Sequence, residues 1–247
     1  MEGGPLLQDW WKEVSKDFIP YVNITSQIPG KPDQGMLAQK GGRGFPYCIF
    51  MDSTGKVLKE ARPSDKDSFT AAMKPITLLT SMRALVAKSG NGSKGKANRQ
   101  NLALIEAVFD PKERQFKQLN KFAKKKSLNE EIRTMYLGMV ETWPIRKEVE
   151  KANKALESAG RDQSRAEAIN EGRNAAMYAL FRRKMDVESP TAPYFDEFWM
   201  GIAEHSVRIE DKKNGLAAIE KMEKKYADNG RALDHFGKVR DKLEMLK

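Results

Sequence analysis

The sequence predicts an α/β domain followed by an all-α domain connected by a flexible linker. Strand-like and helix-like segments alternate over residues 1–88, whereas helical periodicity alone fills residues 98–247. Between them, residues 89–97 are rich in Gly, Ser and Lys, the composition of a flexible linker. A chain of 247 residues has room for two modest domains of this kind.

The first 88 residues contain apolar segments of both periodicities. Leu6, Trp10 and Val14 recur at helical spacing after Pro5, which suits the first position of a helix. Gly55 permits the positive φ of a hairpin turn between two short apolar strands. The expected elements are a helix over 5–17, strands over 18–25, 47–51 and 56–60, a short helix over 33–39, and helices over 66–73 and 75–88.

From residue 98 onward the pattern predicts helices separated by short breaks. Asp110-Pro111, Trp143-Pro144, Gly160, Ser189-Pro190 and Asn229-Gly230 interrupt the apolar periodicity. Most of the expected helices are 12–18 residues long and the connections between them are short, which is typical of antiparallel helix pairs. The expected helices span 98–109, 111–126, 128–142, 145–159, 161–185, 194–209, 212–227 and 229–246.

Composition limits the chemistry that the chain can perform. Cys48 is the single cysteine, so no intramolecular disulfide and no two-cysteine redox or zinc site is available. His205 and His235 are the only histidines and give no metal-ligand spacing, so we expect neither a metal nor another cofactor. We expect Cys48 to be a buried, unreactive thiol within a strand.

We also expect a cytoplasmic protein without a membrane segment. No apolar run approaches the roughly 18 residues that span a bilayer. The first residues lack the basic start and apolar core of a signal peptide. Export remains the alternative if a signal peptide precedes Met1.

The net charge of +10 is concentrated in one segment. Residues 89–126 contain ten basic and three acidic residues, whereas residues 127–247 contain equal numbers of each. Such a segment suits an acidic partner or nucleic acid. We favour a solvated linker and a Lys-rich helix end, and do not expect nucleic-acid binding.

The loop Gly41-Gly-Arg-Gly-Phe-Pro-Tyr47, with the strand and Asp-Ser-Thr-Gly hairpin after it, resembles the second half of thioredoxin. The resemblance covers residues 5–88 and implies a thioredoxin-like fold. It also implies that Pro46 is a cis proline and that Phe45 lies beside a bound peptide. The substrate- or peptide-binding residues implied are Arg43, Gly44, Phe45, Pro46 and Tyr47.

The chain departs from that family at the site of its chemistry. The family's first strand and its Cys-x-x-Cys pair are both missing here, so we expect no catalytic residue in this chain. A sheet without its first strand leaves two interior edges unpaired. Either a segment upstream of Met1 supplies the strand, which we favour, or the 18–25 strand pairs directly with the hairpin, or a partner supplies a strand.

The helical half resembles degenerate tetratricopeptide-type repeats. Residues 214–227 carry small residues at Ala217 and Ala218 that allow close helix packing. The aromatic residues of the 194–199 segment could anchor a peptide, but packing of an amphipathic helix explains them more simply.

Three functions follow from the sequence. The first is a redox-inactive, thioredoxin-like adaptor that binds a protein or peptide. The second is a fragment of a thiol–disulfide oxidoreductase whose Cys-x-x-Cys segment lies upstream of Met1. The third is a basic module that contacts nucleic acid through residues 89–126. We favour the adaptor, and the sequence sets no oligomeric state.

Overall fold

The computed structural model describes residues 9–19, 30, 33, 35–42, 47–61, 66–189 and 192–246. By their internal contacts the residues form two compact units, Met1–Leu137 and Gly138–Lys247. The division falls within one long helix, α6 (Glu130–Ala159). Each unit is described by itself below.

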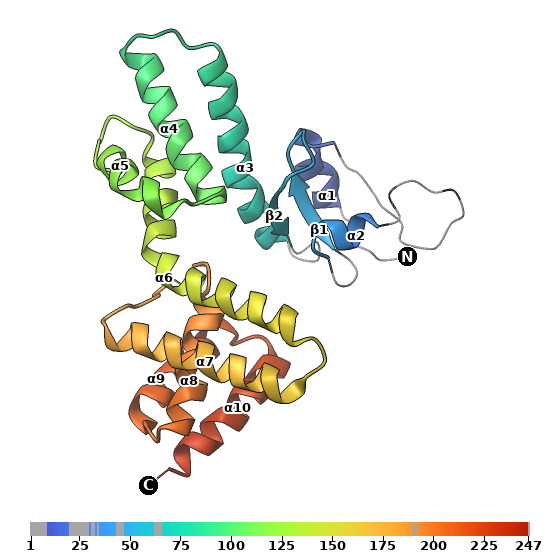
Figure 1. Ribbon diagram of the computed structural model, residues 1–247, viewed down its shortest axis with the longest axis vertical. Helices are drawn as coiled ribbons and strands as arrows, with labels where there is room; N and C mark the ends of the chain where they lie inside the picture. The colour runs from blue at the N-terminus through green and yellow to red at the C-terminus, as the bar shows by residue number, and fades with distance from the viewer. Residues whose placement is uncertain are drawn as a thin grey trace. The chain divides into compact units, whose positions relative to one another are not determined.

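The first unit contains both strands that the described residues form. In chain order its elements are α1 (Asp9–Val14), the 3-10 helix η2 (Ser15–Asp17), α2 (Met36–Gln39), β1 (Cys48–Met51), β2 (Val57–Ala61), α3 (Lys66–Ala87), α4 (Ser93–Phe109), α5 (Glu113–Ala123) and the start of α6. Figure 1 shows α3 and α4 side by side, consistent with their direct contact.

The predicted hairpin is confirmed. β1 and β2 pair antiparallel with Cys48 opposite Ala61 and Phe50 opposite Lys59, and the register is irregular between Phe50 and Met51. Gly55 at the turn has φ +77°, in the region that glycine adopts without steric cost. The hairpin packs against α3, where Phe50 and Phe69 are buried with ring centroids 5.1 Å apart.

The predicted thioredoxin-like α/β domain is wrong. The described residues form a two-stranded sheet, and most of the rest are helical. Phe18 and Ile19, the first residues of the strand predicted over 18–25, are not in a strand; residues 20–25 lie outside the described ones. The hairpin sequence fixes a local turn, which many folds contain, and a thioredoxin sheet needs further strands from distant segments.

The predicted helix break at Trp143-Pro144 is wrong, because α6 runs through Pro144, and the two helices predicted over 66–73 and 75–88 are one helix, α3, which contains Pro75. A proline in a helix removes one hydrogen bond and strains the preceding turn. Buried side chains beside each proline offset that cost: Met73 and Ile76 flank Pro75, and Ile145 follows Pro144. The 89–97 boundary stays a prediction, although α4 begins inside that segment at Ser93.

The second unit is a set of packed helices. It contains the rest of α6 and α7 (Gln163–Arg182), α8 (Phe195–Arg208), α9 (Lys212–Lys225) and α10 (Gly230–Glu244). Consecutive helices from α7 to α10 contact one another, and α8 also contacts α10 (Figure 1). The side chains of Asp162, Asp211 and Asn229 cap α7, α9 and α10 by accepting hydrogen bonds from backbone amides.

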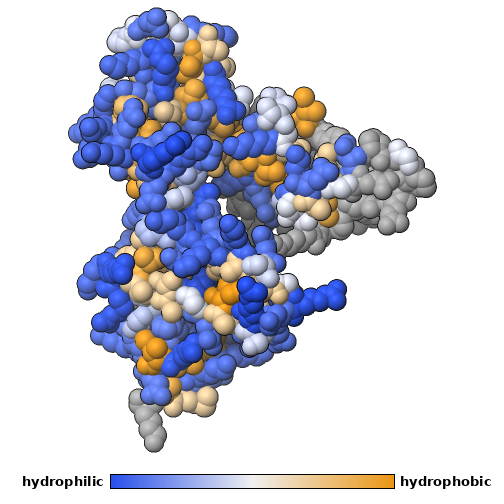
Figure 2. Space-filling model, in the orientation of Figure 1, coloured by the Kyte–Doolittle hydropathy of each residue, from blue (hydrophilic) through white to orange (hydrophobic). Residues whose placement is uncertain are grey.

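The core of this unit is centred on α8. Phe198, Ile202 and Ala203 are fully buried, and Trp199 donates a hydrogen bond from Nε1 to the backbone oxygen of Val187 at 2.8 Å. The aromatic residues at 195–199 therefore pack in the core, as the simpler sequence interpretation expects. On the face that Figure 2 shows, hydrophilic residues predominate and hydrophobic ones form small separate groups.

Candidate functional site

Of the five residues that the sequence assigns to a peptide site, the structure describes Tyr47. Its hydroxyl donates a hydrogen bond to the backbone oxygen of Lys40 at 2.9 Å. Burial, with a smaller contribution from Glu60, raises the pKa of Tyr47. Arg43, Gly44, Phe45 and Pro46 lie outside the described residues, so the site and the proposed cis proline stay predictions.

The region next to Tyr47 is closely packed. Gly42 has no space for a side chain, because a Cβ there would lie 2.7 Å from Cδ1 of Tyr47. Lys40 donates a hydrogen bond from Nζ to the backbone oxygen of Gly55 at 2.6 Å, which ties this segment to the hairpin turn. Tyr47 therefore has a structural contact of its own, whatever it contributes to binding.

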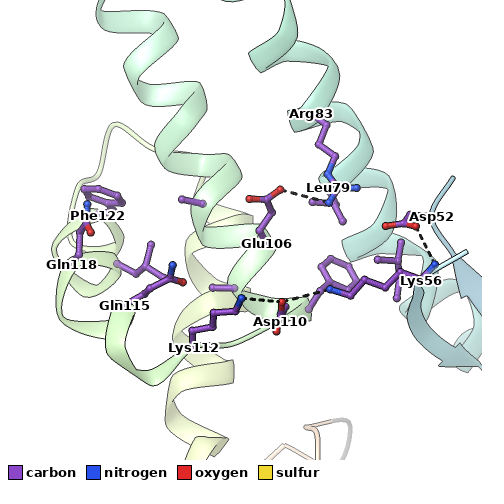
Figure 3. A pocket seen from close by; sticks show the side chains of 15 residues that line it. Asp52, Lys56, Leu79, Arg83, Glu106, Asp110, Lys112, Gln115, Gln118 and Phe122 are labelled. Atoms are coloured by element: carbon purple, nitrogen blue, oxygen red, sulfur yellow. Dashed lines mark hydrogen bonds and ion pairs between the residues drawn. The ribbon is translucent and has the colours of Figure 1, made fainter. Parts of the chain in front are cut away.

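A separate cleft of about 400 Å³ lies within the first unit. It opens between the hairpin turn and helices α3, α4 and α5 (Figure 3). Its apolar lining comes from Leu58, Leu79, Ala103, Ala107, Phe109, Leu119 and Phe122. Leu79 and Leu119 are buried in the core, so the apolar part of the cleft is anchored to the fold.

Charged side chains of both signs line the same cleft. Asp110 lies between Lys56 and Lys112, with Oδ2 at 3.5 Å and 3.6 Å from the two Nζ atoms (Figure 3). Arg83 and Glu106 form a further pair at 3.5 Å. With Asp52 the lining contains three carboxylates and three cations, so its formal charges balance.

Asp52 is engaged by the hairpin turn. Its Oδ1 accepts hydrogen bonds from the Thr54 hydroxyl at 2.6 Å, the Thr54 amide at 2.9 Å and the Lys56 amide at 3.1 Å. The hydrogen bond from the Thr54 hydroxyl is the largest cause that lowers the pKa of Asp52. Asp52 is therefore an ionised acceptor at neutral pH and not a proton donor.

Local sequence explains how α4 and α5 frame the cleft. Asp110 is the C-cap residue of α4, and Pro111 follows, where the helix cannot continue. α5 then begins at Glu113 and buries Phe116, Leu119 and Ala123 on one face. The exposed amides of Gln115 and Gln118 lie beside that face and line the cleft.

Sequence reasoning missed this cleft. The turn at Asp52–Lys56 and the break at Asp110–Pro111 are both recognisable, but nothing in the sequence brings them together. Lys56 and Asp110 are separated by 54 positions, and they meet because β2 and α4 both pack against α3.

The other candidate reactive groups, Cys48 and His205, are not among the residues that line this cleft. Cys48 is half-buried, and burial raises the pKa of its thiol. Burial, and then the nearby charge of Arg208, lower the pKa of His205, whose ring centroid is 5.2 Å from that of Tyr178. Within the described ranges, no group of three His, Cys, Asp or Glu side chains could hold a metal ion.

Comparison with models of protein families, with curated proteins and with solved structures finds no match to this chain. None of the helices that the structure describes is long and apolar enough to cross a membrane.

Proposed function

We propose that this chain binds a peptide segment of a protein partner in the cleft between the hairpin turn and α3, α4 and α5. The observation that carries the proposal is an apolar floor surrounded by balanced charges and by the exposed side-chain amides of Gln115 and Gln118. The cleft volume falls within the range of about 300–1,000 Å³ typical of ligand sites.

Each part of the cleft suits one part of a peptide. The apolar floor at Leu79 and Leu119 would accept one or two apolar side chains. Gln115 and Gln118 each offer an amide donor and an acceptor, the complement of a peptide backbone. The charged groups beside the floor would orient charged side chains of the peptide.

The balance of charge favours a peptide over a polyanion. Lys56 and Lys112 both face Asp110, and Arg83 faces Glu106, so each cation already has a carboxylate neighbour. A phosphate group would have to compete with these carboxylates. A peptide of mixed charge gains from both signs.

The lining also favours binding over catalysis. Among the described residues that line it there is no Ser, Thr, Cys, His or Tyr, the groups that most often act as nucleophiles or shuttle protons near neutral pH. Asp52 is committed to the turn by the hydrogen bonds that it accepts from Thr54 and the Lys56 amide.

A peptide-display selection against the full chain tests the proposal. Selected peptides are then measured against Gln118→Arg, which places a long charged side chain at the cleft, and against Gln163→Arg as the control. Gln163 is equally an exposed glutamine on a helix, outside the cleft. We expect Gln118→Arg to weaken binding about tenfold or more, equivalent to 1.4 kcal/mol, and Gln163→Arg to leave it unchanged.

Hydrogen exchange on the complex gives a second readout. Bound peptide should slow exchange at the amides of the hairpin turn and α5 relative to those of α7 and α8. The proposal fails if no selected peptide distinguishes the two variants, or if the protected amides lie away from the cleft.

A further inference from the structure

Helix α5 carries a row of cations on a face that the cleft does not use. Arg114, Lys117 and Lys121 of α5 and its C-cap residue Lys124 follow one another three or four residues apart, so their side chains project from the same side of the helix. All four are exposed, whereas Phe116, Leu119 and Ala123 on the far side are buried. The cleft-lining Gln115 and Gln118 lie to one side of the row.

These cations are not neutralised by the fold. Across the residues that the structure describes, no ion pair involves any of the four. Their segment, residues 89–126, contains three carboxylates. Two of these, Glu106 and Asp110, pair with Arg83, Lys56 and Lys112 and with none of the four cations of the row.

We propose that this row of α5 binds the phosphate backbone of double-stranded nucleic acid without reading its sequence. The row extends for about 15 Å along the helix axis, and phosphates repeat along a duplex at a spacing that flexible lysine side chains can follow. Neutralising phosphates releases condensed counterions, which is the main source of sequence-independent binding.

A duplex fits this face better than a single strand does. Binding of single strands relies on exposed aromatic rings that stack on bases. The two aromatic residues of α5 do not serve this purpose: Phe116 is buried, and half-buried Phe122 lines the cleft with Nζ of Lys125 5.4 Å from its ring centroid.

The lack of exposed apolar residues in the row also favours nucleic acid over a protein or a membrane as the partner. Protein interfaces depend on a few apolar or aromatic anchors, and amphipathic helices bind membranes by inserting apolar residues beside the cations. The row from Arg114 to Lys124 has no exposed apolar residue between its cations. Charge is the complementary property that this face offers, and the phosphate backbone matches it.

The test measures binding of the full chain to a labelled DNA duplex of about 20 base pairs, at salt concentrations from about 50 to 200 mM. The variant is R114Q/K117Q/K121Q/K124Q. The control K154Q/K213Q/K224Q/R231Q removes the same charge from exposed positions of the second unit that make no ion pair in the described structure. Circular dichroism verifies that both variants keep their helices.

We expect the α5 variant to bind at least about tenfold more weakly at low salt, with the slope of log affinity against log salt reduced by about 3 to 4. The control variant should keep most of the slope. The proposal is overturned if the full chain does not bind the duplex at low salt, or if both variants lose affinity equally. It is also overturned if a single strand, polyglutamate or anionic vesicles bind the α5 row more tightly than the duplex does.

Discussion

Nζ of Lys56 lies 3.5 Å from Oδ2 of Asp110, across a separation of 54 positions in the chain. The contact joins the hairpin turn to the C-cap residue of α4 at the edge of the cleft. Both side chains are more than half exposed, at 59% and 53%. Because water screens such a pair, we expect it to orient the cleft more than it stabilises the fold.

A double-mutant cycle of Lys56→Gln and Asp110→Asn measures how much this ion pair contributes to the stability of the fold. Exposed pairs contribute about 0.2–1 kcal/mol, so the coupling energy in urea unfolding should fall within that range. It should decrease when salt is raised, because the charges are accessible to ions. A coupling above about 2 kcal/mol would contradict this and show that the pair is effectively buried.

The hydrogen bond from Tyr178 to Asp211 predicts a pH-dependent contribution to stability. The Tyr178 hydroxyl donates to Oδ2 of Asp211, and Oδ1 of this carboxylate caps α9 by accepting from the Asn214 amide at 3.3 Å. Burial opposes ionisation of Asp211, but the hydrogen bonds from Tyr178 and Asn214 outweigh it and hold its pKa below that of an ordinary aspartate. The carboxylate therefore contributes stability that is fully present above the pKa of the unfolded state and is lost as pH falls through the folded-state pKa.

Tyr178→Phe should cost about 1 kcal/mol of unfolding free energy at neutral pH. The difference from the original chain should shrink once Asp211 is protonated at acid pH, because the acceptor is then neutral. Urea titrations at several pH values measure this difference in unfolding free energy. In an Asp211→Asn background, the change in unfolding free energy caused by Tyr178→Phe should not vary with pH over this range. If it did vary, a group other than Asp211 would be responsible for the pH dependence.

Local features of this fold were predictable from the sequence, and the long-range ones were not. The Asp52–Gly55 turn and the ends of α4 and α6 at Pro111 and Gly160 follow from residues within a few positions, and the structure has them. The helix through Pro144 was missed, because the breaking tendency of proline is local and the burial of Ile145 that offsets it is not.

The same limit explains the wrong α/β prediction and the missed cleft. A hairpin followed by a helix occurs in many folds, and the number of strands in its sheet depends on pairing between distant segments. The cleft likewise depends on Lys56 and Asp110 meeting through the packing of β2 and α4 against α3. The row of cations on α5 was visible as a basic segment, but only the burial of Phe116 and Leu119 shows which side of the helix it occupies.

Cys48 should react slowly with alkylating reagents in the folded protein. It is half-buried in β1, and burial raises the pKa of its thiol, so less of the reactive thiolate is present at a given pH. The rate of reaction with iodoacetamide at pH 8 should therefore increase when the chain is unfolded in urea. Equal rates in the folded and unfolded chain would contradict the burial of this thiol.

Two helical glycines should respond to alanine substitution in opposite directions. Gly215, in α9, lies against α10 and α8, and a Cβ there would clash with Leu243 and lie 2.9 Å from Cβ of Ser206. Leu243 and Ser206 are both fully buried, so neither can move away without disturbing the core. Overpacking of this kind costs about 1–3 kcal/mol, which exceeds the gain of up to about 1 kcal/mol from replacing a helical glycine.

Gly237 provides the matched control, because it lies within α10 and a Cβ there meets nothing within 4 Å. Gly237→Ala should therefore gain the helix propensity alone and raise the unfolding free energy by about 0.5–1 kcal/mol. Urea unfolding of both variants gives the comparison. Equal stabilisation by Gly215→Ala and Gly237→Ala would contradict this prediction. It would mean that α9 does not approach α8 and α10 closely enough to require a glycine at position 215. The packing of the second unit would then be looser than its buried core indicates.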